Sequence, residues 1–265
     1  MVSLDRRELL KTAGSVALIG TVAGCMGQES ESEDNASSEG EQQEGSGSGN
    51  DSAEEETGEG GQDGEMAMVR VTHLSPDAPN VDIYVDDQAV LEDVPYRTVS
   101  DYLELEPGTY GVRITAAGDE ETVVFDEQVD VAAGWFTLAA VGELEGQNQP
   151  FEVLVLEDDL SDPGQNARVR VLHASPDAPE VDLVAADSGD PLAEGLAFGD
   201  TGSFEVPEGA YTLEVRPAGG EEAVAEFDVE VAAGSVYSAF AVGYVEPADA
   251  PVDAPFELEV VEDTQ

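Results

Sequence analysis

Basic side chains are almost missing from this chain of 265 residues, which has nine Lys and Arg against 60 Asp and Glu. Residues 1–25 contain three of the basic residues and two of the acidic ones, so the remainder carries a net charge of −52 and no lysine. Nucleic acid is excluded as a partner, because binding to phosphates needs a cluster of positive charges.

The excess of negative charge also bears on the solvent. Acidic groups repel one another in dilute buffer, whereas at 1 M salt the Debye length falls to about 3 Å and most of the repulsion is screened. We infer a protein adapted to multimolar salt, such as that of a halophilic archaeon. The alternative is a calcium-loaded surface protein in ordinary salt, with carboxylates as ligands.

A hydrophobic run long enough to cross a membrane is missing near the N-terminus. Residues 13–24 carry no charge, but twelve helical residues span only about 18 Å of a hydrocarbon core about 30 Å thick. The segment therefore fits the apolar part of a removable signal peptide within residues 1–25. Arg6 and Arg7 precede it and favour the twin-arginine export route. An ordinary secretory signal with two adjacent arginines is the alternative.

Cysteine occurs once, at Cys25, so an internal disulfide cannot form. This residue closes Val22-Ala23-Gly24-Cys25, which resembles the lipobox at which prokaryotic lipoproteins are cleaved and lipidated. The resemblance implies that Cys25 becomes a lipidated N-terminus, which would anchor the exported protein to the outer face of the cytoplasmic membrane. The alternative is an incidental small residue near a signal-peptidase site.

Residues 26–66 lack the side chains needed to build a core. From 26 to 65 there are 14 Asp or Glu, nine Gly and seven Ser, with no Val, Ile, Leu, Phe, Tyr, Trp, Lys or Arg. Such a segment cannot bury enough apolar surface to offset the entropy lost on ordering. We therefore expect a disordered acidic tether, about 35 Å from end to end as a flexible coil.

The rest of the chain is a tandem repeat. VRVTHLSPDAPNVD at 69–82 returns as VRVLHASPDAPEVD at 169–182, with 11 of 14 positions identical. Near the end of each copy, PFEVLVLED at 150–158 matches PFELEVVED at 255–263. This period predicts two similar domains, 67–160 and 168–265, joined by a linker at 161–167.

Within each copy, apolar and other residues alternate. In residues 110–115, Tyr, Val and Ile alternate with Gly, Arg and Thr, which is typical of an antiparallel strand with one buried face. About seven such strands per copy predict an all-β fold of two tandem immunoglobulin-like or transthyretin-like β-sandwiches. In the first copy we expect strands at 69–73, 81–86, 97–104, 109–116, 121–131, 135–142 and 151–157.

The repeated opening segment contains the residue types that could do chemistry. His73 shares one face of its strand with two valines and should point to the core, while Arg70 and Thr72 lie on the opposite, polar face. Residues 75–79, Ser-Pro-Asp-Ala-Pro, must end the strand, because proline fixes φ and removes a hydrogen-bond donor. We interpret the segment as a rigid corner in which His73 bonds to the backbone or to Asp82.

Two functional uses of the corner are alternatives. A calcium site could be built from aspartate and carbonyl oxygens, and a hydrolase could combine Ser75 with His73 and Asp77. The proline-braced corner offers no Gly-rich nucleophile elbow for the second use, and duplication favours a scaffold feature over both. The candidate ligand-binding residues are His73, Asp77, Asp82, His173, Asp177 and Asp182.

Several of these motifs together resemble a known family. They are H-x-S-P-D-A-P-x-V-D at 73–82 and 173–182, YRTVSDY at 96–102, FGDTGSF at 198–204 and PGTY at 107–110. They resemble domain-of-unknown-function family 4397, found in exported bacterial and haloarchaeal proteins, and the resemblance implies no reaction and no catalytic residue. PGTY also resembles the turn before a late strand of fibronectin-type and transthyretin-like sandwiches, with Tyr110 as a tyrosine corner.

Taken together, the sequence predicts a lipid-anchored surface protein without enzymatic activity and without a cofactor. Its expected role is binding or structural at the cell envelope, with the membrane reached through Cys25 and an envelope protein or glycan as partner. The alternative is an extracytoplasmic protein that binds a small ligand or calcium, and a hydrolase is the least favoured function.

Overall fold

A computed structural model describes residues 65–263, which all belong to one compact unit of the chain. The expected export signal with Arg6 and Arg7, the lipidation residue Cys25 and the tether up to residue 64 lie outside the described residues. Between residues 65 and 263 there is no helix that is long and apolar enough to cross a membrane.

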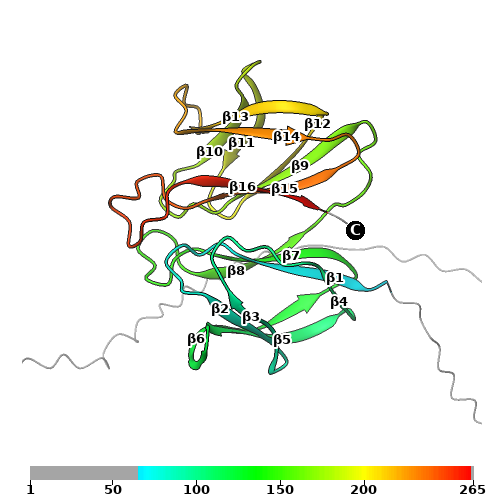
Figure 1. Ribbon diagram of the computed structural model, residues 1–265, viewed down its shortest axis with the longest axis vertical. Coiled ribbons are helices and arrows are strands. Elements are labelled where there is room, and N and C mark those ends of the chain that lie inside the picture. Colours follow the sequence, from blue (N-terminus) through cyan, green and yellow to red (C-terminus); the bar gives the residue numbers. More distant parts are fainter. Residues whose placement is uncertain (1–64, 264–265) are drawn as a thin grey trace, which may run out of the picture. The chain divides into compact units, whose positions relative to one another are not determined.

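The first copy forms a sandwich of two four-stranded sheets (Figure 1). One sheet has the order β4-β1-β7-β8 and the other has the order β3-β2-β5-β6. Pairing is antiparallel except between β1 and β7, which run parallel. The strands are β1 (Ala67–His73), β2 (Val81–Val85), β3 (Gln88–Val94), β4 (Leu103–Leu105), β5 (Gly108–Ala116), β6 (Asp119–Val131), β7 (Gly134–Val141) and β8 (Glu152–Glu157).

The second copy repeats this topology strand for strand. Its sheets have the orders β12-β9-β15-β16 and β11-β10-β13-β14, again with one parallel pair, β9 with β15. The predicted all-β fold of two tandem sandwiches is confirmed. The strands are β9 (Asn166–His173), β10 (Val181–Ala185), β11 (Asp190–Leu196), β12 (Thr201–Pro207), β13 (Gly209–Pro217), β14 (Ala225–Val231), β15 (Val236–Val242) and β16 (Glu257–Asp263).

The expected number of seven strands per copy is wrong, because each sandwich has eight. The missed strand of the first copy is β3, which pairs with β2 through a tight turn at Asp86 and Asp87. Both aspartates adopt positive φ, 48° and 63°, as the central residues of a two-residue hairpin turn do. Hairpin turns of this kind usually contain glycine, so the Asp-Asp pair gave no clear signal.

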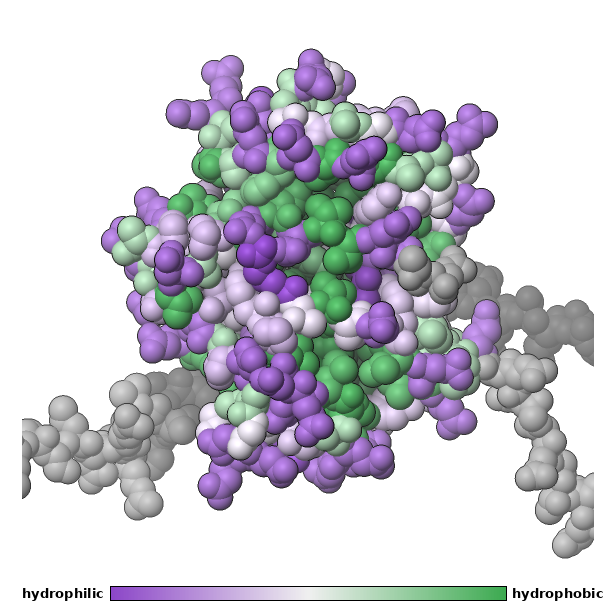
Figure 2. Space-filling view, in the orientation of Figure 1, coloured by the Kyte–Doolittle hydropathy of each residue, from purple (hydrophilic) through white to green (hydrophobic). Residues whose placement is uncertain are grey.

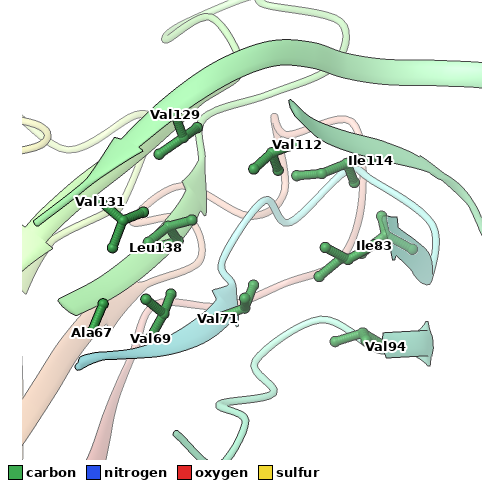
Figure 3. Close-up of a cluster of buried hydrophobic side chains, with 11 residues drawn as sticks. Ala67, Val69, Val71, Ile83, Val94, Val112, Ile114, Val129, Val131 and Leu138 are labelled. Atoms are coloured by element: carbon green, nitrogen blue, oxygen red, sulfur yellow. The ribbon is translucent and has the colours of Figure 1, made fainter. Parts of the chain in front are cut away.

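The alternation of apolar residues places one side of each strand in a core between the two sheets (Figure 3). In the first sandwich, Val69 and Val71 of β1 face Ile83 of β2 and Val112 and Ile114 of β5 within one buried cluster. The second sandwich has an equivalent cluster built from the equivalent strands. The tyrosine corner expected at Tyr110 is confirmed, because Tyr110 Oη donates to the Glu106 carbonyl oxygen at 2.6 Å. Tyr211 makes the equivalent bond in the second copy, to the Pro207 carbonyl oxygen at 2.8 Å.

The other face of β1 also lies inside the molecule. Arg70 and Thr72, which the alternation places on the polar face, are 3% and 0% exposed. The reason is that the sheet containing β1 packs against the sheet containing β9 of the second copy (Figure 1). A buried apolar cluster from both copies fills this interface, and its members are Leu74, Ala139, Val141, Leu172, Ala174, Phe240 and Val242.

Candidate functional site

The histidine of each repeated corner bonds to the backbone of its own corner. His73 is 1% exposed, and its Nε2–H donates to the carbonyl oxygen of Pro79 at 3.1 Å. His173 makes the equivalent bond to Pro179, also at 3.1 Å. A carbonyl oxygen can only accept, so the proton of the neutral imidazole lies on Nε2. Of the two partners considered for His73, the structure therefore selects the backbone and not Asp82.

The first aspartate of the motif holds a distant loop to the corner. Asp77 accepts hydrogen bonds from the backbone amides of Leu144 at 2.9 Å and Glu145 at 3.0 Å, in the loop that follows β7. Asp177 accepts two amide bonds from Val245 and Glu246, both at 2.8 Å. Each corner is thus tied to the segment that leaves the parallel strand of the same sandwich.

The second aspartate holds two other turns. Asp82 accepts the backbone amides of Asp93 at 2.7 Å and Gly118 at 2.8 Å, and Asp182 does the same for Gly195 and Gly219. The structure therefore directs Asp77 and Asp82 to different loops. Across residues 65–263, no three His, Cys, Asp or Glu side chains are grouped as metal ligands would be. Calcium binding at the corners stays a prediction, to be measured by calorimetric titration in molar KCl.

The serine of the corner is not arranged as a nucleophile. Ser75 is 0% exposed, and its hydroxyl donates to Asp77 Oδ1 at 3.4 Å. In the second copy the hydroxyl of Ser175 donates to the Gly243 carbonyl oxygen at 2.7 Å. A reactive serine needs an adjacent base and access to substrate, so the geometry gives the hydrolase alternative no support.

Burial also fixes how the two histidines titrate. It lowers the pKa of His73 below its ordinary value of 6.5, against an opposing effect of the Pro79 carbonyl. Burial likewise lowers the pKa of His173, although the Pro179 carbonyl, Asp200 and Asp177 act in the opposite direction. Both imidazoles also face an aromatic ring, Tyr96 in the first copy and Phe198 in the second.

We expect the free energy of unfolding to fall as the pH drops below 6.5. Below pH 6.5 the unfolded chain binds protons at both histidines while the folded chain does not. The contribution of the two neutral imidazoles to the free energy of unfolding is therefore fully present above pH 6.5, and it is lost as the pH falls towards the lowered pKa of the folded state. The slope should be about 1.4 kcal/mol per pH unit for each histidine. Denaturation between pH 5 and 8 measures it, and the double variant His73→Gln/His173→Gln should remove the slope. An unchanged slope in that variant would contradict this origin.

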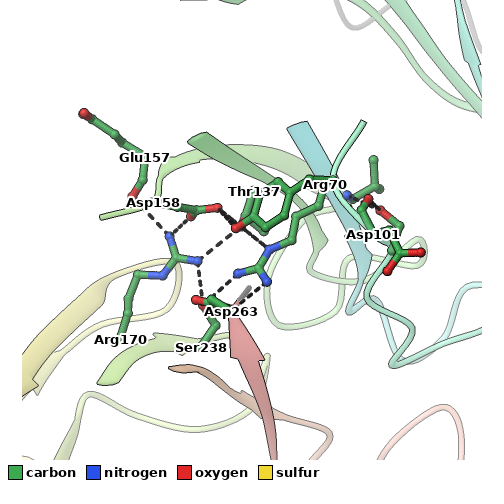
Figure 4. A network of polar contacts seen from close by, with 11 residues as sticks. Arg70, Asp101, Thr137, Glu157, Asp158, Arg170, Ser238 and Asp263 are labelled. Atoms are coloured by element: carbon green, nitrogen blue, oxygen red, sulfur yellow. Dashed lines mark hydrogen bonds and ion pairs between the residues drawn. The ribbon is translucent and has the colours of Figure 1, made fainter. Parts of the chain in front are cut away.

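A second group of polar residues is buried between the sandwiches (Figure 4). Arg70 of β1 donates from Nε to Thr137 Oγ1 at 2.8 Å within its own copy. It reaches into the other copy through Nη1 to Asp263 Oδ1 at 2.6 Å and through Nη2 to Ser238 Oγ at 2.8 Å. Thr137 in turn donates to Asp158 Oδ2 at 2.7 Å.

Arg170 of β9 holds the position of Arg70 in the second copy and makes the equivalent contacts with the first copy. Its Nη1 donates to Asp158 of the first copy, and its Nη2 contacts Thr137 at 3.2 Å and Ser238 at 2.9 Å. Asp158 and Asp263 hold the same position in the two copies, at the ends of the repeated PFEVLVLED and PFELEVVED blocks. Each arginine thus pairs with the carboxylate of the other copy, as residues do across the symmetric interface of a homodimer. We call these six residues the interface network: Arg70, Thr137, Asp158, Arg170, Ser238 and Asp263.

Another pair of residues links the copies at the loops after β7 and β15. The hydroxyl of Tyr244 donates to Glu143 Oε1 at 3.0 Å, and both residues are buried. Glu143 Oε2 accepts the backbone amide of Asn148 at 2.6 Å. Burial is the largest cause that raises the pKa of the Tyr244 phenol well above its usual range, and the hydrogen bond to Glu143 acts in the same direction. This hydroxyl therefore remains a donor at ordinary pH.

The interface network does not follow from the strand pattern of either copy alone. The alternation of residues in the strand places Arg70 on a polar face and names no partner for it, and nothing in the local sequence marks Asp158 or Asp263. A usable signal was present, however. Only six arginines follow residue 25, and two of them occupy the same position in the two copies, as do the two aspartates. In so acidic a chain, an arginine repeated at one strand position indicates a specific carboxylate partner.

The fold and its buried contacts define a class of protein, a tandem pair of eight-stranded β-sandwiches joined through an internal interface. The chain belongs to the family described as domain of unknown function (DUF4397), whose model matches residues 67–184 and again residues 167–265. No curated protein matches the chain.

Three solved structures show a distant likeness. The Bacillus anthracis TIE protein has a TM-score of 0.22 and 13% identity over 68% of this chain, which spans only 34% of that protein. A family 26 carbohydrate-binding module of Eubacterium rectale, in complex with maltoheptaose, has a TM-score of 0.24 and 9% sequence identity, and the match covers 75% of this chain and 98% of that module. A candidate cell adhesion protein of Bacteroides fragilis has a TM-score of 0.20 and 10% sequence identity, and the match covers 75% of this chain and 98% of that protein.

Proposed function

We propose that the protein is a non-catalytic module of the cell envelope, in which two sandwiches act as one rigid binding or structural unit. The observation that carries this proposal is the set of hydrogen bonds that the repeated motif makes. In both copies its histidine bonds to a backbone carbonyl and its aspartates accept backbone amides. Side chains that could act on a substrate are thus engaged in holding loops, and the chemistry that the two copies share is that of a scaffold.

The proposed location is the outer face of the cytoplasmic membrane. It is supported by Arg6 and Arg7 ahead of a short apolar segment, and by Cys25 at the end of a lipobox-like sequence. In this proposal the acidic segment 26–66 holds the sandwiches away from the membrane, where they meet an envelope protein or a glycan. The acidic surface suits brine, because salt screens repulsion between its carboxylates.

Replacing the only cysteine tests the anchor. We expect Cys25→Ser to move the protein from the membrane pellet to the soluble fraction, because the acyl chains that hold it can no longer be attached. Fractionation followed by immunoblotting measures the shift, with Ser30→Ala as a control that should stay in the pellet. Retention of Cys25→Ser in the membrane would show that another segment anchors the chain.

The binding role is tested with the protein itself as bait. A pull-down from an envelope extract in molar KCl should retain a specific protein or glycan. Recovery of the bait alone, as a monomer without any retained ligand, would count against a binding role and leave only a structural one.

A further inference from the structure

Two clefts flank the interface network, and the repeat relates them to each other. The first has a volume of about 350 Å³ and lies between strands of the first sandwich and β16 of the second, with Met68, Arg70, Tyr102, Trp135, Val261 and Glu262 in its walls. The second, of about 210 Å³, has Arg168, Arg170, Ser203, Val236, Glu157 and Asp158 in its walls. The strand registers pair Met68 with Trp135 and Arg168 with Val236, so Val236 holds the position of Trp135.

The first cleft contains a fixed pair of aromatic rings. The rings of Tyr102 and Trp135 meet edge to face, with 4.8 Å between centroids and 88° between planes. The hydroxyl of Tyr102 donates to Asp158 Oδ2 at 2.7 Å, which ties this ring to the interface network. Trp135 is half-buried and is the only tryptophan in the chain. A rigid aromatic surface is thus held in a concave, partly polar site, as ligand sites require.

The second copy shows that the fold does not need these rings. It builds the same β9–β15 pairing with Val236 in place of tryptophan, and Ser203 lies opposite Arg170 where Tyr102 adjoins Arg70. The scaffold therefore tolerates small side chains at both positions. The aromatic pair is a property of one cleft alone, which points to a ligand at that cleft and not to the stability of the sandwich.

We propose that the first cleft binds a neutral oligosaccharide, which deepens the binding role proposed above and rests on it. The apolar face of a pyranose ring stacks on the indole of Trp135, because contact between an apolar ring face and an aromatic ring removes both from water. Its hydroxyl groups donate to the carboxylates of Asp101 and Glu262, both of which are exposed at the cleft. Such a ligand fits a site that combines aromatic rings with hydrogen-bond acceptors.

Charge selects a neutral ligand over an ionic one. A cation is disfavoured because the guanidinium of Arg70 already lies 4.8 Å from the centroid of the Tyr102 ring, where it would repel a second positive charge. An anion meets the carboxylates of Asp101 and Glu262. In molar salt, moreover, attraction between ions is screened beyond about 3 Å, whereas ring stacking and hydrogen bonds at contact distance remain.

The single tryptophan makes the test direct. Titrating the exported chain in molar KCl with chitohexaose, cellohexaose and mannohexaose should give a saturable change in Trp135 fluorescence with at least one of them. Calorimetry on the variants then locates the site. Trp135→Val, which copies the residue of the second cleft, should abolish the heat, and Asp101→Asn/Glu262→Gln should weaken binding tenfold or more. Glu157→Gln, which changes the glutamate that holds the position of Glu262 at the second cleft, should leave binding unchanged.

Three results would overturn the inference. The first is equal affinity in wild type and Trp135→Val, whose fold circular dichroism can verify. The second is a fluorescence change that saturates with tetramethylammonium chloride and not with sugars, which would make the cleft a cation site. The third is no binding to the three hexasaccharides or to an array of neutral glycans. In that third case a partner still retained from envelope extract by Trp135→Val would leave the broader binding role standing.

Discussion

Replacing Arg70 with methionine should lower the free energy of unfolding by about 3–5 kcal/mol, the cost of removing one partner from a buried ion pair. Methionine keeps much of the length of the arginine but leaves Asp263 without the guanidinium that contacts it at 2.6 Å. Both carboxylates of the interface network are almost fully buried, with 1% of Asp158 and 3% of Asp263 exposed. Neither can exchange the lost cation for water, so the folded state bears the loss.

Denaturation in molar KCl measures this effect, and Arg216→Met is its matched control. Arg216 is 23% exposed and pairs with Glu214 of its own strand, so its loss should cost no more than about 1 kcal/mol. The double variant Arg70→Met/Asp263→Leu should regain much of the stability, because it removes both members of the pair and leaves the contact between Arg170 and Asp158 in place. Equal effects of Arg70→Met and Arg216→Met would contradict the burial of the network.

Features that depend on neighbouring residues could be predicted from the sequence. The alternation around His73 placed it towards the core, and the two prolines of residues 75–79 placed the corner between two strands. Tyr110 follows Pro-Gly-Thr, and its hydroxyl bond to Glu106 spans only four residues. In each case the residues that interact lie at most six positions apart in the chain. Over so short a segment, proline, glycine and side-chain hydrogen bonding restrict the backbone to few conformations.

Features that depend on the packing of the two copies could not be predicted in the same way. The partners of Arg70 lie 67, 168 and 193 residues away in the chain. Alternation assigns Arg70 to the face opposite the core, but water and a second sheet are equally compatible with a polar side chain there. Figure 2 shows hydrophilic residues over much of one face of the molecule, where they meet water. The interface network shows the other case, in which polar side chains meet a second sheet. The meeting of Tyr102 with Trp135 depends on the same packing.

The turn that ends β7 gives the second large expected effect. Gly142 has a φ of +81°, and a Cβ built on it would lie 2.1 Å from the carbonyl oxygen of Pro150. This contact is with backbone and not with the end of a flexible side chain, so the loop from 143 to 150 would have to move. That loop supplies the amides of Leu144 and Glu145 to Asp77, and it contains Glu143, which accepts the Tyr244 hydroxyl.

We therefore expect Gly142→Ala to lower the free energy of unfolding by more than about 3 kcal/mol, with about 1–2 kcal/mol from the positive φ alone and the rest from the displaced loop. Gly118→Ala isolates the first contribution, because Gly118 has a φ of +74° and a Cβ added there would meet nothing within 4 Å. Gly243→Ala should repeat the full loss in the second copy, where the Pro255 carbonyl oxygen lies 2.3 Å from the position that a Cβ would take. Denaturation of the three variants in molar KCl gives the comparison. If Gly142→Ala costs no more than Gly118→Ala, a Cβ at residue 142 does not displace the loop from 143 to 150, and the close approach of the Pro150 carbonyl is contradicted.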